Sequence, residues 1–213
     1  MAIGRVLKRT LGQALPGIVL FRGAPGPSPR VALTFDDGPH KDHTRAILDV
    51  LAAGGAQATF FLQGSEAARH PTLVRAIHED GHQLGNHGWA HSRASEVGLR
   101  AFVREVVDTQ ALLEDVLGRA LPRIYRPPYG AVSLAAFLAL AGRGFRFVFW
   151  SLDSEDSFIQ DAGQLARRIE TAPVRSGEVL LFHEDYAHTL AALPAVVTSL
   201  KSRAFALVKV ADL

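Results

Sequence analysis

The stretch Arg30-Val-Ala-Leu-Thr-Phe-Asp-Asp-Gly-Pro39 decides the fold, because it joins an apolar run to a turn that carries two adjacent carboxylates. Residues 31–35 are typical of a buried strand. Asp-Gly-Pro favours a turn. Adjacent carboxylates at the end of a buried strand repel each other and lose hydration, so we expect a cation to offset their charge. A plain turn is the alternative interpretation of this stretch taken alone.

Strand and helix patterns alternate from this stretch to the end of the chain. Strands are predicted at residues 31–35, 57–62, 82–86, 123–125, 145–151, 179–183 and 206–210, and helices at residues 43–53, 66–79, 95–117, 133–141, 164–171 and 189–201. This alternation predicts an α/β fold with a parallel sheet. Periodicity leaves open a barrel and an open doubly wound sheet. No Gly-rich phosphate loop follows the first strand, which disfavours a nucleotide-binding Rossmann fold.

The composition is that of a globular protein of one sizeable domain, with 213 residues, 48% apolar and 21% charged. The formal net charge is only +2 and the basic residues are scattered, so no nucleic acid partner is expected. The chain has no Cys, so a transition metal must be bound by His and carboxylate side chains. No apolar run approaches the length of a membrane span.

The first 29 residues differ in pattern from the rest, and we predict an N-terminal helical and linker extension at 1–29 and one domain at 30–213. Apolar residues recur at helical spacing near the start, and residues 23–29 are rich in Gly and Pro. A short helix that packs on the domain is expected, with a membrane-surface anchor through residues 1–22 as the alternative. No cleavable signal peptide is recognised, so the expected location is cytoplasmic, with membrane association as the variant.

Unusual polar side chains follow five of the predicted strands. In parallel barrels active sites are built at the carboxyl ends of the strands, and five clusters at one edge are hard to attribute to core packing. The residues concerned are Asp36 and Asp37, His87 and His91, Arg126, Asp153 and Asp156, and His183.

The pair His87-Gly-Trp-Ala-His91 is the strongest indication of a metal. Two His four residues apart can bind one ion, and a carboxylate from Asp37 completes a set that leaves a position open for water on zinc or a similar cation. Gly88 stands where the zincin motif requires Glu. Of the histidines outside the predicted site, His82 is predicted to be structural. The other five are predicted to face solvent, and they are His40, His43, His70, His78 and His188.

Two later clusters suit acid–base chemistry. Arg126-Pro-Pro-Tyr-Gly130 is a rigid loop that can place an Arg beside a carboxylate or direct a backbone N–H at an oxyanion. His183 ends a buried strand, where a lone His is more often structural. Paired with a carboxylate such as Asp156, it would be oriented and its pKa raised, as a general acid requires.

Taken in order, Thr34-Phe-Asp-Asp-Gly38, His87-x-x-x-His91, Arg126-Pro-Pro-Tyr-Gly130, Asp153-x-x-Asp156 and Leu181-Phe-His183 resemble the motifs of the polysaccharide deacetylase family. This family is also called the NodB-homology domain or carbohydrate esterase family 4. The resemblance covers about residues 30–211. It implies a distorted (β/α)7 barrel and metal-dependent removal of N-acetyl groups from amino sugars in glycans such as chitin oligomers or peptidoglycan.

The resemblance also implies a role for each site residue. Asp37, His87 and His91 correspond to ligands of one divalent ion, zinc first, with cobalt, nickel and manganese as alternatives. Asp36 corresponds to the general base and Arg126 to the residue that orients it. Tyr129 corresponds to the residue whose backbone N–H binds the oxyanion, and His183 to the general acid, with Asp156 as its partner. The acyl and substrate pocket corresponds to Leu181, Pro128 and Trp89.

Two departures from the family pattern leave the substrate open. Gly88 replaces a hydroxyl residue that steadies the metal loop, and Ser157 replaces a Trp that walls the acetyl pocket, for which Trp89 or Phe158 could substitute. The expected substrate is an acetylated amino-sugar glycan or a lipid-linked sugar. The first alternative is a deformylase or amidase of the same fold that acts on a formamido sugar or small amide. The alternative of another class is a non-catalytic glycan-binding protein.

Overall fold

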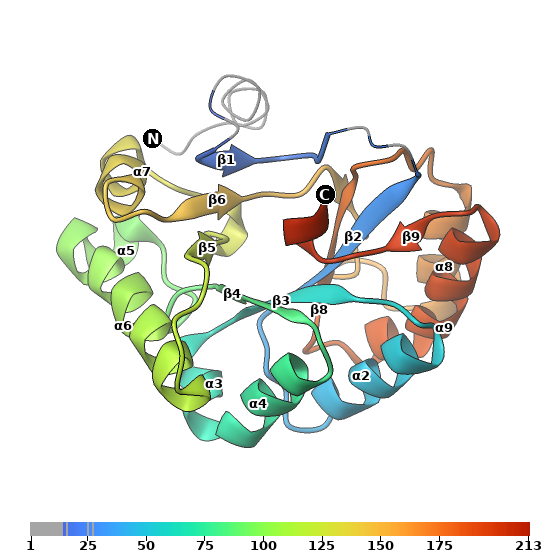
Figure 1. Cartoon of the computed structure of the whole chain (residues 1–213), viewed down its shortest axis with the longest axis horizontal. Coiled ribbons are helices and arrows are strands. Elements are labelled where there is room, and N and C mark those ends of the chain that lie inside the picture. The colour runs from blue at the N-terminus through green and yellow to red at the C-terminus, as the bar shows by residue number, and fades with distance from the viewer. Residues whose placement is uncertain (1–14, 16, 25, 27) are drawn as a thin grey trace.

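The computed structural model has a curled sheet with helices along its outer side (Figure 1), and within the part of the chain it describes every strand pairing is parallel. The structure describes residues 15, 17–24, 26 and 28–213. The strands are β1 (Val19–Leu20), β2 (Arg30–Asp36), β3 (Ala58–Leu62), β4 (Gln83–Asn86), β5 (Ile124–Tyr125), β6 (Arg146–Val148), β7 (Leu152–Asp153), β8 (Val179–His183) and β9 (Ala206–Leu207). Their order is β1-β6-β5-β4-β3-β2-β8-β7, with β9 beside β2.

The sheet comes round on itself because β6 and β7 are successive parts of one bent stretch. β6 pairs with β5, whereas β7 pairs with β8 on the other side of the ring. The predicted α/β fold with a parallel sheet is confirmed, and of the two arrangements left open it is the (β/α)7-type barrel in a single domain.

The helices are α2 (Thr44–Ala53), α3 (Gly64–Arg69), α4 (Pro71–Glu79), α5 (Ala94–Val97), α6 (Leu99–Leu117), α7 (Leu134–Ala141), α8 (Ala162–Thr171) and α9 (Ala187–Ser202), with short 3-10 turns η1 (Pro128–Gly130) and η2 (Val210–Asp212). Two predicted helices are each divided. The helix expected at 66–79 breaks before Pro71, whose ring cannot continue a preceding helix, and the one expected at 95–117 breaks at Gly98, where φ is 79°.

Alternation along β2 separates the core from the site. Val31, Leu33 and Phe35 belong to the large core between sheet and helices. The side chains between them alternate to the other face, where Ala32 joins a smaller cluster inside the ring. Thr34 and Asp36 therefore face the interior of the ring, and Asp36 lies at its carboxyl end.

Two predicted strands are shorter than expected. The strand expected at 145–151 ends as β6 at Val148, and the one expected at 206–210 ends as β9 at Leu207, before η2. The predicted extension at 1–29 also contains a strand, because β1 pairs with β6 and the N–H of Gly23 donates to the carbonyl of Gly177 at 2.8 Å. The helix expected near the start of the chain lies outside the described residues.

No helix among the described residues is both long and apolar enough to span a bilayer.

Candidate active site

Two neighbouring strands bring Asp36 and His183 together. In the parallel pairing of β2 and β8, Asp36 is in register with His183, and Thr34 with Leu181. Residues two apart on a strand share a face, so all four side chains point to the same side of the sheet. The sequence separates these residues widely, and the register of one strand pair places them at one edge.

A buried guanidinium holds Asp36. Arg126 lies directly after β5 and has no exposed surface, and its Nη1 donates to Asp36 Oδ1 at 2.7 Å and to Thr34 Oγ1 at 2.8 Å. Its remaining nitrogens donate to the carbonyls of Val148 and Phe149. A buried charge must be paired and hydrogen-bonded in this way. The predicted contact of Arg126 with Asp36 is present.

Asp37, His87 and His91 converge as a candidate metal centre. Asp37 Oδ1 lies 3.5 Å from His87 Nε2 and 3.3 Å from His91 Nε2. His87 Nδ1 lies 2.7 Å from the carbonyl of Arg126, to which a protonated Nδ1 donates, and this leaves the Nε2 lone pair free for a cation. One ligand atom of each residue lies within 4.8 Å of the others. Two imidazoles and a carboxylate at these distances fit a divalent ion such as zinc.

The pKa values in this cluster suit metal binding. Burial alone would raise the pKa of the Asp37 carboxyl, but the nearby His87 and His91 outweigh it and lower that pKa. Burial lowers the pKa of His91. A carboxylate at Asp37 and a neutral imidazole at His91 are the protonation states in which these two side chains bind a cation.

The loop that carries both ligand histidines is fixed without a hydroxyl at residue 88. The N–H of Gly88 donates to Asn86 Oδ1 at 2.9 Å, and Asn86 Nδ2 donates to the carbonyl of Val106 at 2.7 Å. Gly88 has φ 81°, which L side chains rarely adopt. Asn86 therefore holds the loop at residue 88, where the family pattern has a hydroxyl residue in that role.

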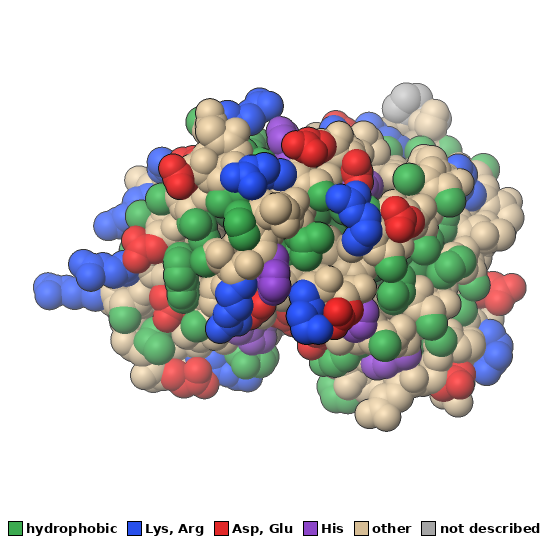
Figure 2. All heavy atoms as spheres, turned by 90° about the horizontal axis from the view of Figure 1, so that it is seen from below, with side chains coloured by type: hydrophobic (Ala, Val, Ile, Leu, Met, Phe, Trp, Pro, Cys, Tyr) green, Lys and Arg blue, Asp and Glu red, His purple; other side chains and the backbone are tan. Residues whose placement is uncertain are grey.

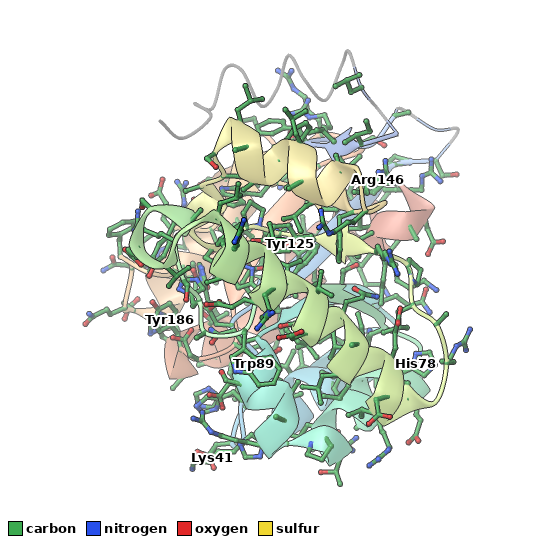
Figure 3. All side chains as sticks on the ribbon, turned by 90° about the vertical axis from the view of Figure 1, so that its left-hand side faces the viewer. Lys41, His78, Trp89, Tyr125, Arg146 and Tyr186 are labelled. Atoms are coloured by element: carbon green, nitrogen blue, oxygen red, sulfur yellow. The ribbon has the colours of Figure 1, made fainter. Side chains whose placement is uncertain are left out.

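Trp89 packs between α3 and α6. A Cβ at Gly64 of α3 would lie 2.5 Å from both the Trp89 ring and Thr109 Oγ1 of α6, so the indole packs at this junction (Figure 3). Phe158 is 84% exposed and cannot wall a pocket. Phe158 therefore does not replace the Trp that the family pattern places at residue 157, and a role for Trp89 in the substrate pocket stays a prediction.

His183 is held by Asp156, as predicted. Its Nδ1 lies 2.7 Å from Asp156 Oδ1, and its backbone N–H donates to Oδ2 at 2.8 Å. Thr189 Oγ1 also donates to Oδ2, at 2.9 Å. Burial alone would lower the pKa of His183, but the hydrogen bond and charge of Asp156 raise it to about 9. His183 is therefore protonated at neutral pH.

A groove of about 530 Å³ opens beside the metal centre, lined among others by Asp37, Gln63, His91, Asp185 and Tyr186. Figure 2 shows histidine, acidic and basic side chains gathered around a hollow in one face of the molecule. Two predicted residues lie buried at the carboxyl ends of the strands, Leu181 in β8 and Pro128 in η1. The centroids of the Tyr129 and His91 rings are 4.4 Å apart. The guanidinium carbon of Arg93 lies 3.6 Å from the centroid of the Tyr129 ring.

Several site residues escaped sequence analysis. Gln63 directly follows β3 and its Nε2 donates to Asp37 Oδ1 at 2.8 Å, so the strand-end rule could have found it. The Tyr186 ring packs edge-on to the His183 ring, with the ring centroids 5.7 Å apart. The prediction that His188 faces solvent is wrong. Its side chain is half-buried, its ring stacks on that of Tyr186, and its Nε2 lies 2.8 Å from the carbonyl oxygen of Asp156. No periodicity signals such contacts.

This geometry defines a class of protein, namely parallel α/β barrels that carry an Asp-His-His set at the carboxyl ends of their strands. The polysaccharide deacetylase profile matches residues 23–148. The chain belongs to the polysaccharide deacetylase family.

Named relatives and a solved structure agree with this assignment. A peptidoglycan-N-acetylglucosamine deacetylase of Listeria monocytogenes is 34% identical over 86% of this chain, which spans only 38% of that protein. A chitooligosaccharide deacetylase of Azorhizobium caulinodans is 34% identical, over 83% of this chain and 90% of that protein. The family 4 carbohydrate esterase of Streptomyces lividans, solved with acetate, superposes with a TM-score of 0.77 at 32% identity, covering 84% of this chain and 91% of that one.

Proposed function

We propose that the protein removes N-acetyl groups from N-acetylglucosamine-type amino sugars in an oligosaccharide or polysaccharide, with one bound zinc ion. The observation that carries the proposal is the joint presence of Asp37, His87 and His91, which fit a metal, and of two further groups beside them, Asp36 and His183. The names of the Listeria and Azorhizobium relatives support an acetylated amino-sugar glycan as the substrate.

In this proposal the chain's own residues move the protons. Asp37, His87 and His91 would hold the zinc ion, which when bound would polarise the acetamide carbonyl and lower the pKa of water. Asp36, with one oxygen bonded to Arg126, accepts the proton of the attacking water through its other oxygen. The backbone N–H of Tyr129 donates to the developing oxyanion. His183, protonated and oriented by Asp156, donates to the amine as the C–N bond breaks and acetate leaves.

The test is acetate release from N-acetylglucosamine oligomers by chelator-stripped protein, with and without added zinc. Zinc-dependent release is expected. A matched panel with formyl in place of acetyl separates the deformylase alternative, which predicts the faster release of formate. Tight oligomer binding by zinc-loaded protein with no release of either acid would overturn the hydrolase and favour glycan binding alone.

The pH profile should carry the signature of His183 on its alkaline side. Because the acid form is required, kcat/KM should fall as the pH rises through the His183 pKa of about 9. Asp156→Asn removes the charge that raises this pKa, so the alkaline limb should move down by about one unit or more. The comparison is made at saturating zinc. An unmoved limb in Asp156→Asn would assign it to another group.

A further inference from the structure

Glu184 is a buried carboxyl group that the proposed reaction does not use. It directly follows His183 and has no exposed surface. Its backbone N–H donates to the carbonyl of Asp36 at 3.0 Å, and its carbonyl lies 2.8 Å from His43 Nδ1. A side chain of this kind is rarely buried without a partner or a role, because its desolvation is costly.

The Glu184 side chain reaches beneath the turn that follows Asp37. Its Oε2 accepts a hydrogen bond from Thr44 Oγ1, at the start of α2, and Thr44 Oγ1 in turn accepts one from the backbone N–H of His40 at 2.7 Å. Its Oε1 is buried and has no hydrogen-bond partner among the described residues. A Cβ placed on Gly38 would lie 1.8 Å from this Oε1. The carboxyl group therefore packs directly on the Gly38 backbone, which explains why only Gly fits at this position of the motif.

Asp37 needs such support. It has φ 71°, a left-handed conformation that costs a non-Gly residue energy unless its surroundings impose it. On one side Gln63 contributes two bonds, from its backbone N–H to the carbonyl of Gly38 at 2.9 Å and from its side chain to Asp37. Glu184 packs against the same turn from β8, the neighbour of β2 on its other edge.

We propose that Glu184 is a positioning residue for the metal ligand Asp37. By holding the backbone of residues 38–40, its carboxyl group fixes the turn that directs Asp37 toward His87 and His91. The inference rests on the metal site of the proposed function. Burial raises the pKa of Glu184 to about 8, so the neutral acid predominates at pH 7 and adds no second negative charge beside Asp37.

Zinc affinity tests this role without any substrate, by competition against a chromophoric chelator. Loss of a group that supports a metal ligand typically costs about 10–100-fold in metal affinity. Glu184→Asp, one methylene too short to reach Gly38, should show a loss of this size, as should Glu184→Ala. Glu184→Gln has the same shape and is neutral, so it should retain the affinity of the unchanged protein.

Glu178 supplies the matched control. It is also buried, at 4% exposure, but it lies directly before β8, at the other end of that strand from Glu184. There it pairs with Arg22 and accepts a hydrogen bond from Ser151. Glu178→Ala should lower the thermal unfolding midpoint and leave zinc affinity unchanged. An equal loss of zinc affinity in Glu178→Ala would show that instability alone is enough, and would overturn the proposal.

The remaining outcomes also decide. If Glu184→Ala does not fold, Glu184→Asp carries the test, and native zinc affinity in folded Glu184→Asp overturns the role. Weak zinc binding by the unchanged protein would instead overturn the metal site itself. Absent acetate release from a protein that binds zinc normally would concern only the proposed reaction.

Discussion

Asp36→Asn is expected to lower kcat for acetate release by about 10²–10⁴-fold, the usual contribution of a positioned general base. The amide keeps an oxygen for Arg126 but cannot take a proton from water. Zinc binding should persist, because the triad of Asp37, His87 and His91 is intact. The measurement is kcat under saturating zinc and oligosaccharide, together with zinc content.

The substitution also removes one partner of a buried ion pair, a change that destabilises proteins by about 3–5 kcal/mol. Thermal unfolding must therefore be followed in the same samples. Arg126→Lys provides the comparison, because it keeps the charge beside Asp36 but loses the fork of donors. Turnover by folded, zinc-loaded Asp36→Asn close to that of the unchanged protein would show that another group takes the proton.

Removing one metal ligand should have the second large effect. His91→Asn deletes an imidazole, and Asn tolerates the left-handed backbone at this position, where φ is 56°. Loss of a residue that only supports a metal ligand lowers metal affinity by about 10–100-fold, and loss of the ligand His91 itself should lower zinc affinity by more than this. Acetate release at equimolar zinc should fall to background.

His78→Ala is the control for this loss, because His78 lies on α4 and belongs to no candidate metal group among the described residues. It should keep both zinc affinity and acetate release. Full activity in zinc-free His91→Asn would contradict a role for His91 in binding the catalytic metal.

The parallel fold was predictable because strands and helices alternate strongly, and residues such as Phe35 and Leu180 form buried, uninterrupted strands. The breaks were harder. The division at Gly98 depends on a backbone conformation, and the early end of β6 depends on the bend that leads into β7. β1 was missed because Val19 and Leu20 form a strand only through their contact with β6, a partner that local periodicity does not reveal.

The site was predictable where its residues end strands. Asp37, His87, His91 and His183 all obey that rule, and the structure brings them to one edge. The place of Trp89 was harder to predict, because its direction depends on packing against α3 and α6. Glu184 and Tyr186 act through contacts with residues distant in sequence, so no motif around them signals their place, whereas the position of Gln63 directly after β3 could have indicated it.

The position of β8 has a consequence for synthesis of the chain. β2 pairs with β3 on one edge and with β8 on the other, yet Thr34 and Leu180, whose hydroxyl and carbonyl are bonded, are 146 residues apart. A chain growing from the ribosome contains all three candidate metal ligands by residue 91, while one edge of β2 has no partner. Pairing at such separation is slow, and an open edge invites association with other chains. The growing chain therefore contains its metal ligands long before the barrel can close, and the β8 edge of β2 is completed only when residues 179–183 have been synthesised.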